Sequence, residues 1–285
     1  MKHVYRLTIS CPDQVGIVAK VATLIAEQGG TIVEANHHTD SVNQWFFMRH
    51  EILASSLTAG LEAFKAAFVP IAEQFQMKWQ ISDSAKPKKI ALFASKESHC
   101  LADLLYRWHE QDLPGEIVCV IANHPDLEEM ANWYRVPFHH VPVTAENKPE
   151  AFATAERLVK QYQADLIVLA RYMQILPPQM CAEFAGRVIN IHHSFLPSFV
   201  GARPYHQAYE RGVKLIGATC HYVTEVLDGG PIIEQDVIRV THAHTAEDLK
   251  RLGRDVEKTV LSRGVRYHLE DRVLIHGNKT VVFEA

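Results

Sequence analysis

The sequence has 285 residues, of which 47% are hydrophobic and 22% charged, a balance typical of a soluble globular protein and not of a disordered or fibrous one. Its formal net charge of −4 provides no broad cationic field, so neither nucleic acid nor an anionic membrane is expected as a partner, whereas a small molecule is. The length favours two domains.

The first domain is predicted from alternating and helix-periodic apolar residues. Residues 4–10 alternate as a strand, and a helix is expected to start near Val15, with Asp13 as its N-cap, and to stop at Gly29. The apolar face of this helix is predicted to be Val15, Val18, Ala22 and Ile25. The later elements are strands over 31–40, 45–53 and 77–82 and a helix over 59–74. The order βαββαβ describes a ferredoxin-like unit.

Residues 84–89 are polar and include Pro87, which cannot continue a strand ladder, so we place a linker there. The domains are therefore expected over residues 1–83 and 90–285. In the second domain, compact apolar runs alternate with helical segments, as βα units of a parallel sheet require. Strands are expected over 90–95, 116–123, 136–143, 164–170, 187–193, 214–223 and 231–240, helices over 98–111, 149–162 and 245–269, and a hairpin at the end. This pattern predicts a doubly wound, Rossmann-like α/β domain.

The densest group of reactive side chains lies at the carboxyl end of one predicted strand. Asn190 and His192 are two residues apart, so they share one face of the strand, and a Pro- and Gly-punctuated loop over 198–204 follows them. Asp228 lies in a Gly-rich turn between two later strands. An amide, an imidazole and a carboxylate supply donors for a tetrahedral oxyanion and a base for an incoming nucleophile. In isolation, each of the three side chains could instead be a strand cap or a hydrogen-bonded turn residue.

The sequence Asn190-Ile191-His192-x-Ser194-x-Leu196-Pro197, with Gly217-Ala218-Thr219 and the segment His221 to Ile233, resembles the signature of the folate-dependent formyltransferases. The likeness covers roughly residues 88–285. It implies that Asn190, His192 and Asp228 form the catalytic set, with the acid orienting a charged imidazole. It also implies that the pterin is held by two segments, whose members are Met173, Gln174, Ile175, Leu176, Val223 and Leu227.

The amino-terminal segment from Cys11 to Val18, with Gly29-Gly30-Thr31-Ile32, resembles the ACT domain, which usually binds amino acids. The resemblance implies a regulatory ligand near Asp13 and Gly16, with methionine or glycine as effectors, and a homo-oligomer. An ACT domain joined to a formyltransferase-like domain is similar to the formyltetrahydrofolate deformylase family along almost the entire chain. That family implies hydrolysis of 10-formyltetrahydrofolate to formate and tetrahydrofolate, which balances one-carbon units and supplies formate to purine synthesis.

The choice between hydrolase and transferase depends on the segment Ala94 to Cys100. Transferases that act on a phosphorylated amine have a Gly-rich loop there whose backbone N–H groups hold the phosphate. Here glycine is missing and Glu97 adds a negative charge, although Lys96 and Ser98 offset it in part. We therefore expect water as the acceptor. The alternatives are a formyltransferase acting on an amine, and an amino-acid sensor with an inactive catalytic domain, against which the intact trio argues.

Neither a metal nor a separate cofactor is expected. Histidines cluster at His37-His38, at His139-His140 and at His242 and His244, but without the spacing of a metal site. The five cysteines are scattered without a CxxC pair, as in reduced thiols of a cytoplasmic protein. The amino terminus has no secretory apolar region, and no segment is long enough to span a membrane.

Overall fold

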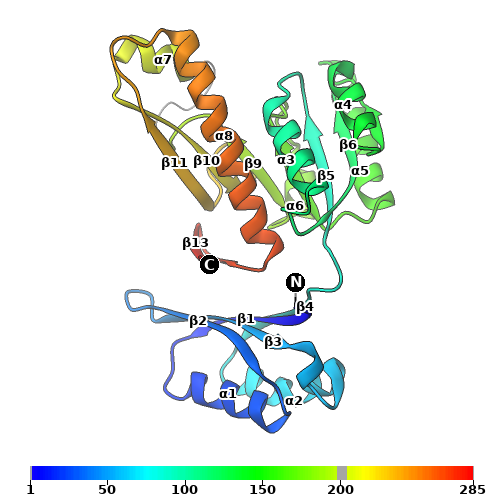
Figure 1. The fold of residues 1–285 in the computed structure, drawn as a ribbon, viewed down its shortest axis with the longest axis vertical. Coiled ribbons are helices and arrows are strands. Elements are labelled where there is room, and N and C mark those ends of the chain that lie inside the picture. The colour runs from blue at the N-terminus through cyan, green and yellow to red at the C-terminus, as the bar shows by residue number, and fades with distance from the viewer. Residues whose placement is uncertain (1, 198–203, 285) are drawn as a thin grey trace. The chain divides into compact units, whose positions relative to one another are not determined.

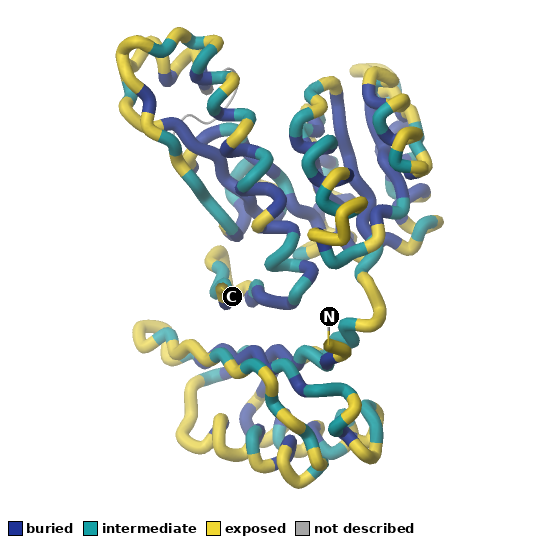
Figure 2. The backbone as a smooth tube through the Cα atoms, in the orientation of Figure 1, coloured by how far each residue is buried: buried dark blue, intermediate teal, exposed yellow. Residues whose placement is uncertain are grey.

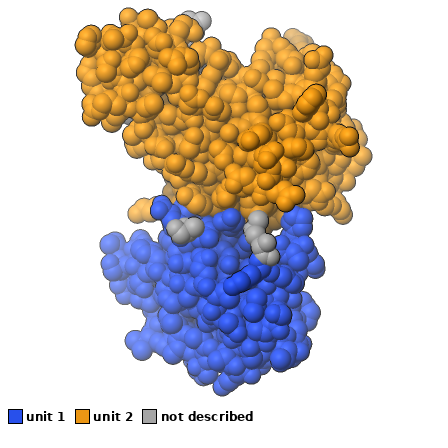
Figure 3. All heavy atoms as spheres, viewed as in Figure 1, with its two compact units in different colours: residues 1–87, 270–276, 281–285 blue, residues 88–269, 277–280 orange. Residues whose placement is uncertain are grey.

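A computed structural model describes residues 2–197 and 204–284. It divides into two compact units (Figure 3), unit 1 with residues 1–87, 270–276 and 281–285, and unit 2 with residues 88–269 and 277–280. Residues 198–203 of the predicted loop lie outside the described part. Each unit is described by itself below.

Unit 1 has the predicted order of strands and helices. Its strands form an antiparallel sheet in the order β2-β3-β1-β4, and two helices cover one face of that sheet (Figure 1). The elements are β1 (Val4–Pro12), α1 (Ile17–Glu27), β2 (Ile32–Asp40), β3 (Trp45–Leu53), α2 (Gly60–Gln74) and β4 (Lys78–Asp83), with a 3-10 turn at Ala54–Ser56. This is the ferredoxin-like arrangement expected from the sequence.

The expectations for the first helix were wrong in two respects. It begins at Ile17, and its N-cap is Gly16, so Asp13 does not cap it. Val15 lies before the helix and is fully exposed, and the observed apolar face is displaced by one residue from the predicted one. The buried residues of this face are Ile17, Val21, Leu24 and Ile25. Apolar residues occupy so many positions of this segment that two phases fit the sequence, and only packing against the sheet selects one.

The uncovered face of β3 carries a buried arginine. Arg49 donates hydrogen bonds to Glu34, to Glu51 and to the carbonyl of Glu270. Beside it, Phe47 packs with Leu274 and Phe283. These contacts explain why residues 270–276 and 281–285, which include β12 (Val273–His276) and part of β13 (Lys279–Val282), group with unit 1.

Unit 2 contains a seven-stranded sheet in the order β11-β10-β9-β8-β5-β6-β7. Five strands are parallel, whereas β10 and β11 run antiparallel to their neighbours, a reversal that the expectation of a parallel sheet missed. The strands are β5 (Lys89–Ala94), β6 (Glu116–Ala122), β7 (Phe138–His140), β8 (Leu166–Ala170), β9 (Val188–His192), β10 (Leu215–Tyr222) and β11 (Ile232–Arg239). Buried strands of either direction are continuous apolar runs, so the sequence does not reveal the reversal.

Helices cover both faces of this sheet, as a doubly wound fold requires. The core on one face joins strand residues such as Phe93 to Phe152 of α5 and Met180 of α6. The other face carries α3 and α8 (Figure 1), and the central strands are buried between the two layers (Figure 2). The helices are α3 (His99–His109), α4 (Glu128–Trp133), α5 (Lys148–Gln161), α6 (Pro178–Glu183), α7 (Pro204–Arg211) and α8 (Ala246–Leu269), with a 3-10 turn at Pro125–Leu127.

The sheet has a topological switch point between β5 and β8. After β5 the chain adds β6 and β7 on one side of it, and then β8 and β9 on the other side. Open α/β sheets bind ligands at the carboxyl ends of the strands beside such a switch point. The fold therefore directs attention to the segments that follow β5, β8 and β9. Among the helices of the described residues, none combines the length and the apolar character that a bilayer crossing demands.

Candidate active site

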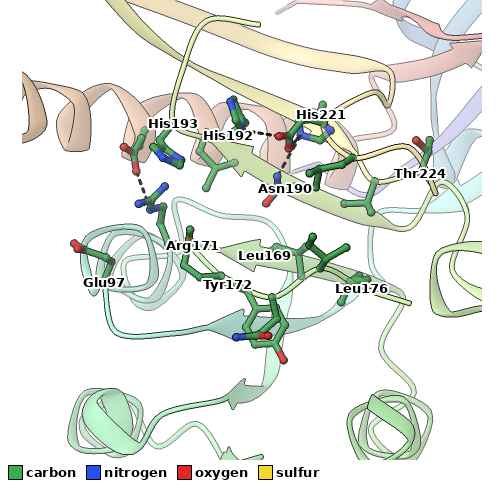
Figure 4. A pocket seen from close by; sticks show the side chains of 18 of the residues that line it. Glu97, Leu169, Arg171, Tyr172, Leu176, Asn190, His192, His193, His221 and Thr224 are labelled. Carbon is green, nitrogen blue, oxygen red and sulfur yellow. Dashed lines mark hydrogen bonds and ion pairs between the residues drawn. The ribbon is translucent and has the colours of Figure 1, made fainter. Parts of the chain in front are cut away.

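A cavity of about 650 Å³ lies at this edge of the unit 2 sheet, and Asn190, His192 and Asp228 all line it (Figure 4). Asn190 and His192 come from β9, whereas Asp228 comes from the loop between β10 and β11. The three side chains singled out from the sequence are therefore brought together in one cavity.

The register of two strands places a further histidine beside them. In the antiparallel pair of β9 and β10, Asn190 lies opposite His221 and His192 lies opposite Thr219. Residues directly opposite each other project from the same face of a sheet, so His221 joins Asn190 and His192 in the cavity. The sequence contained His221 within its signature but gave no reason to assign it a role, because the register of the two strands was unknown.

His192 is bound on one side and open on the other. Its Nδ1 atom lies 3.2 Å from Oδ2 of Asp228, so this nitrogen carries a proton and donates it to the carboxylate. Its Nε2 atom is buried and has no hydrogen-bond partner within the described part of the chain. A buried polar atom without a partner costs free energy, and in a cavity it marks a position that a ligand atom can satisfy.

Asp228 is held in its ionised form. The hydrogen bond from His192 lowers the pKa of this carboxyl far below its usual value, although burial opposes it. Its backbone is left-handed, with φ of 52°, which is a strained conformation for a residue other than glycine. The loop is fixed at Gly230, where a Cβ would lie 1.8 Å from the carbonyl oxygen of Tyr222. Only glycine allows this close approach of the two backbone segments. Any larger residue at position 230 would push the loop away from Tyr222 and so displace Asp228.

His221 also orients the amide of Asn190. The Nδ1–H of His221 donates to the carbonyl of its neighbour Tyr222 over 2.9 Å, so its Nε2 is an acceptor. The Nδ2 of Asn190 donates to that nitrogen over 3.2 Å. The second N–H of the same amide group remains for a ligand in the cavity.

The wall beside these polar groups is apolar. All six residues expected to hold the pterin line it: Met173, Gln174, Ile175, Leu176, Val223 and Leu227. Met173, Ile175 and Leu227 are 56%, 59% and 56% exposed, which is unusual for large apolar side chains gathered at one site. The Oγ of Ser95, at the end of β5, accepts a hydrogen bond from the backbone of Met173 and anchors this segment. An exposed apolar wall beside oriented polar groups is typical of a small-molecule site.

The opposite end of the cavity is polar, and the sequence drew attention only to Glu97 in it. The charged and imidazole side chains there are Glu97, His99, Arg171, His193, His206, Lys250, Arg254 and Glu257. Burial beside Arg171 lowers the pKa of His193 to about 3, so this imidazole is neutral at physiological pH. These residues come from α8 and from the segments after β5, β8 and β9, which meet only in the folded chain. No local sequence motif therefore predicts this group.

Beside this end, three residues have atoms that could bind a metal ion within 4.8 Å of one another, namely His99, Cys100 and Glu257. Their surroundings do not suit a metal ion. The Nε of Arg171 lies 3.4 Å from the carboxylate of Glu257, and this cation opposes a second one. Burial raises the pKa of the Cys100 thiol well above its ordinary value, so the thiolate form that binds metals is disfavoured.

The paired histidines of the sequence contact neighbouring residues. His37 and His50 are joined by their Nε2 atoms over 2.8 Å, and His139 contacts the hydroxyl of Tyr162. His244 accepts a hydrogen bond from the backbone of Thr241. Asp13 and Gly16 are exposed residues of unit 1 and do not line the cavity of unit 2.

Comparison with known families assigns both parts of the chain. The formyl transferase model matches residues 88–265, and the ACT domain model matches residues 5–67. The first match includes Asn190, His192 and Asp228.

Curated relatives and solved structures agree with these matches. A formyltetrahydrofolate deformylase of Bacillus subtilis is 48% identical over 98% of this chain and 93% of its own length. The crystal structure of a formyltetrahydrofolate deformylase from Pseudomonas syringae superposes with a TM-score of 0.98 at 63% identity, covering 100% of this chain and 95% of that one. A glycinamide ribonucleotide transformylase from Symbiobacterium toebii gives a TM-score of 0.66 at 31% identity, covering 70% of this chain and 95% of that one.

Proposed function

This chain belongs to the formyltetrahydrofolate deformylase family, and from that premise we propose how it hydrolyses 10-formyltetrahydrofolate to formate and tetrahydrofolate. Asn190, His192 and Asp228 act on the formyl group, and the apolar wall holds the pterin. The observation that carries this assignment is the Nε2 atom of His192, which is buried, unpartnered and open to the same cavity as the exposed apolar residues.

In the proposed first step, water attacks the formyl carbon while its oxygen accepts hydrogen bonds from Asn190 and from protonated His192. Asp228 holds this imidazole in place, because its Oδ2 lies 3.2 Å from Nδ1. As the carbonyl oxygen becomes an oxyanion it takes the Nε2 proton of His192. The loss of that positive charge removes the charge attraction of His192 that helps to keep the pKa of Asp228 low, so the carboxylate can take a proton from the water.

In the second step the bond between the carbon and N10 breaks. Asp228 returns its proton to the leaving nitrogen, through a water molecule where the distance requires one, and His192 takes a proton back from a hydroxyl of the intermediate. The products are formic acid, which ionises to formate, and tetrahydrofolate. Both catalytic groups return to their starting forms, and the reaction requires neither a metal nor a cofactor.

The second candidate is formyl transfer to an amine, since a transformylase has the same fold. The same trio would serve that reaction, because only the occupant of the nucleophile position differs. The segment after β5 favours water. It has no glycine between Ala94 and Cys100, and the carboxylate of Glu97 lines the cavity, where it opposes an anionic phosphate.

For unit 1 we propose a regulatory role that follows from its ACT domain match. An amino acid such as methionine or glycine would bind near Asp13 and Gly16, and the chain would form a homo-oligomer in the cytoplasm. A deformylase with such a sensor would adjust the supply of formate for purine synthesis to the balance of one-carbon units.

The purified protein, incubated with 10-formyltetrahydrofolate in a buffer free of amines, tests the reaction. Formate and tetrahydrofolate should appear in equal amounts, and Asp228→Asn should lower kcat by about 100-fold or more, the usual contribution of acid–base catalysis. Asp126→Asn, at an exposed position outside the cavity, is the matched control and should retain full activity. Turnover only after an amine is added would identify a transferase instead.

A further inference from the structure

The polar end of the cavity contains a buried carboxylate that the proposed reaction does not use. Glu257 of α8 is only 1% exposed. Its Oε1 accepts a hydrogen bond from the hydroxyl of Tyr205 over 2.5 Å, and its Oε2 accepts one from Nε2 of His99 over 2.7 Å. The Nε of Arg171 lies 3.4 Å from the same Oε2. An ionised carboxylate is costly to bury, and partners on both oxygens offset that cost.

Helix α8 is shaped to hold this group. Gly253 precedes Glu257 by one turn, so both residues lie on the same face of the helix. A Cβ at Gly253 would lie 2.1 Å from the hydroxyl oxygen of Tyr205. Glycine within a helix costs about 1 kcal/mol relative to alanine. Here it allows the ring of Tyr205 to lie against α8 and its hydroxyl to reach Glu257.

Arg171 is placed by a strained backbone. It is the first residue after β8, and its φ of 62° is in the left-handed region that favours glycine. Its side chain lies on the same side of the cavity as His193, with the ion pair to Glu257 drawn as a dashed line (Figure 4). Within the described part of the chain, its terminal guanidinium nitrogens make no hydrogen bond, and the side chain lines the cavity. Strain of this kind is retained where the position of the side chain matters.

The other carboxylate of this end is also neutralised. Glu97 accepts a hydrogen bond from Arg254 over 2.6 Å, and Nζ of Lys250 lies 3.9 Å away. Three permanent cations therefore face two carboxylates, and both carboxylates are paired with them. A further cation that entered this end would find both of these carboxylates already paired.

The two ends of the cavity differ in what they can bind. The pterin is expected on the apolar wall, which leaves the polar end, lined by Arg171, for the acceptor. An amine acceptor arrives mainly as an ammonium ion at neutral pH, so it requires, besides Asp228, a carboxylate that binds it and receives the proton it must lose before it attacks. Water is neutral, so Asp228 alone takes its proton, and it does not need the space that the guanidinium occupies.

We propose that Arg171, held by Glu257, determines the specificity of this site by excluding amine acceptors and leaving water as the nucleophile. The inference rests on the proposed function and deepens it, because it names the side chain that separates hydrolysis from formyl transfer. In this proposal Arg171 acts on the choice of acceptor and not on the chemical step.

Arg171→Gly in the full chain tests the proposal, since glycine suits the backbone at this position. The enzyme is given 10-formyltetrahydrofolate and glycinamide, and the ratio of formylglycinamide to formate is measured. This ratio should rise by about tenfold or more over wild type, the scale on which one changed contact alters discrimination. Arg171→Lys keeps a cation at this position and should keep a ratio close to that of wild type.

A matched double variant identifies the role of the carboxylate. In Arg171→Gly with Glu257→Gln, the ammonium has no acidic partner, so most of the gain should disappear. If Arg171→Gly does not fold, Arg171→Gln, which keeps a side chain of similar shape, should give a rise in the same direction. An unchanged ratio in a folded variant that still releases formate overturns the proposal. Failure of the proposed function is distinguishable, because wild type would then release no formate in the absence of glycinamide.

Discussion

The Nδ1 atom of His192 lies 3.2 Å from Oδ2 of Asp228, and this contact divides the imidazole into a bound side and an open side. The open side is Nε2, which is buried without a partner in the described structure, next to Asn190. The pair therefore presents one donor to the cavity in a fixed direction, and the electrostatic stabilisation of an oxyanion requires such a donor.

Asn190→Ala removes the second donor expected at the formyl oxygen. We expect kcat to fall by about 100- to 1000-fold with a small change in KM, as when one oxyanion donor is lost. Steady-state kinetics with 10-formyltetrahydrofolate measures both parameters. A KM that rises while kcat stays constant would show that Asn190 binds the substrate without acting in the transition state.

Ile175→Ala shortens one side chain of the apolar wall. Ile175 is 59% exposed, so the free protein should lose little stability, whereas the bound pterin should lose apolar contact. We expect KM to rise by roughly 5- to 10-fold, which corresponds to about 1 kcal/mol of lost burial. Ile275→Ala, an exposed isoleucine outside the cavity, should leave KM unchanged.

Gly230→Ala should damage the site through the backbone. The added Cβ would lie 1.8 Å from the carbonyl oxygen of Tyr222, so the loop that carries Asp228 must move. We expect both a loss of roughly 1–3 kcal/mol of stability and a large fall in kcat. Gly212→Ala is the control: its φ of 65° is unfavourable for alanine, but its Cβ meets open space. It should lose stability and retain kcat, whereas equal activity in the two variants would argue against a fixed loop.

His50 gives the stability of unit 1 a dependence on pH. Burial, and then the neighbouring His37, lower the pKa of His50 to about 4. Between the ordinary histidine pKa of about 6.5 and this value, the unfolded chain binds a proton that the folded chain refuses. The free energy of unfolding should therefore decrease as the pH falls through this window, by up to roughly 3 kcal/mol. Urea titrations from neutral to acidic pH measure the free energy of unfolding. If His50 causes its decrease, His50→Gln should show a smaller decrease over the same pH range.

The parts of the fold and site that the sequence predicted are those encoded locally. The order of elements in unit 1 follows from alternating and periodic apolar residues. Asn190 and His192 lie in one short signature, and Asp228 lies in a second segment of the same family pattern. The phase of α1 was mispredicted, because the segment from Val15 to Ile25 offers two apolar faces and the sheet selects one.

The remaining features depend on contacts between distant segments. The position of His221 beside Asn190 depends on the register of β9 with β10. The antiparallel direction of β10 cannot be recognised in its sequence, because buried strands of either direction are apolar. The pairing of Arg171 with Glu257 requires α8 to pass the end of β8. Likewise, the grouping of Glu270 with unit 1 depends on its contact with Arg49. None of these relationships has a short-range pattern.

The most direct measurement of the central claim is the source of the second oxygen in the product. A single turnover of 10-formyltetrahydrofolate is carried out in water enriched in ¹⁸O, and the formate is analysed by mass spectrometry. If water attacks the formyl carbon, each formate should carry one ¹⁸O atom, and Asp228→Asn should slow its appearance. Formate without ¹⁸O, or no formate until an amine is present, would contradict hydrolysis at this site.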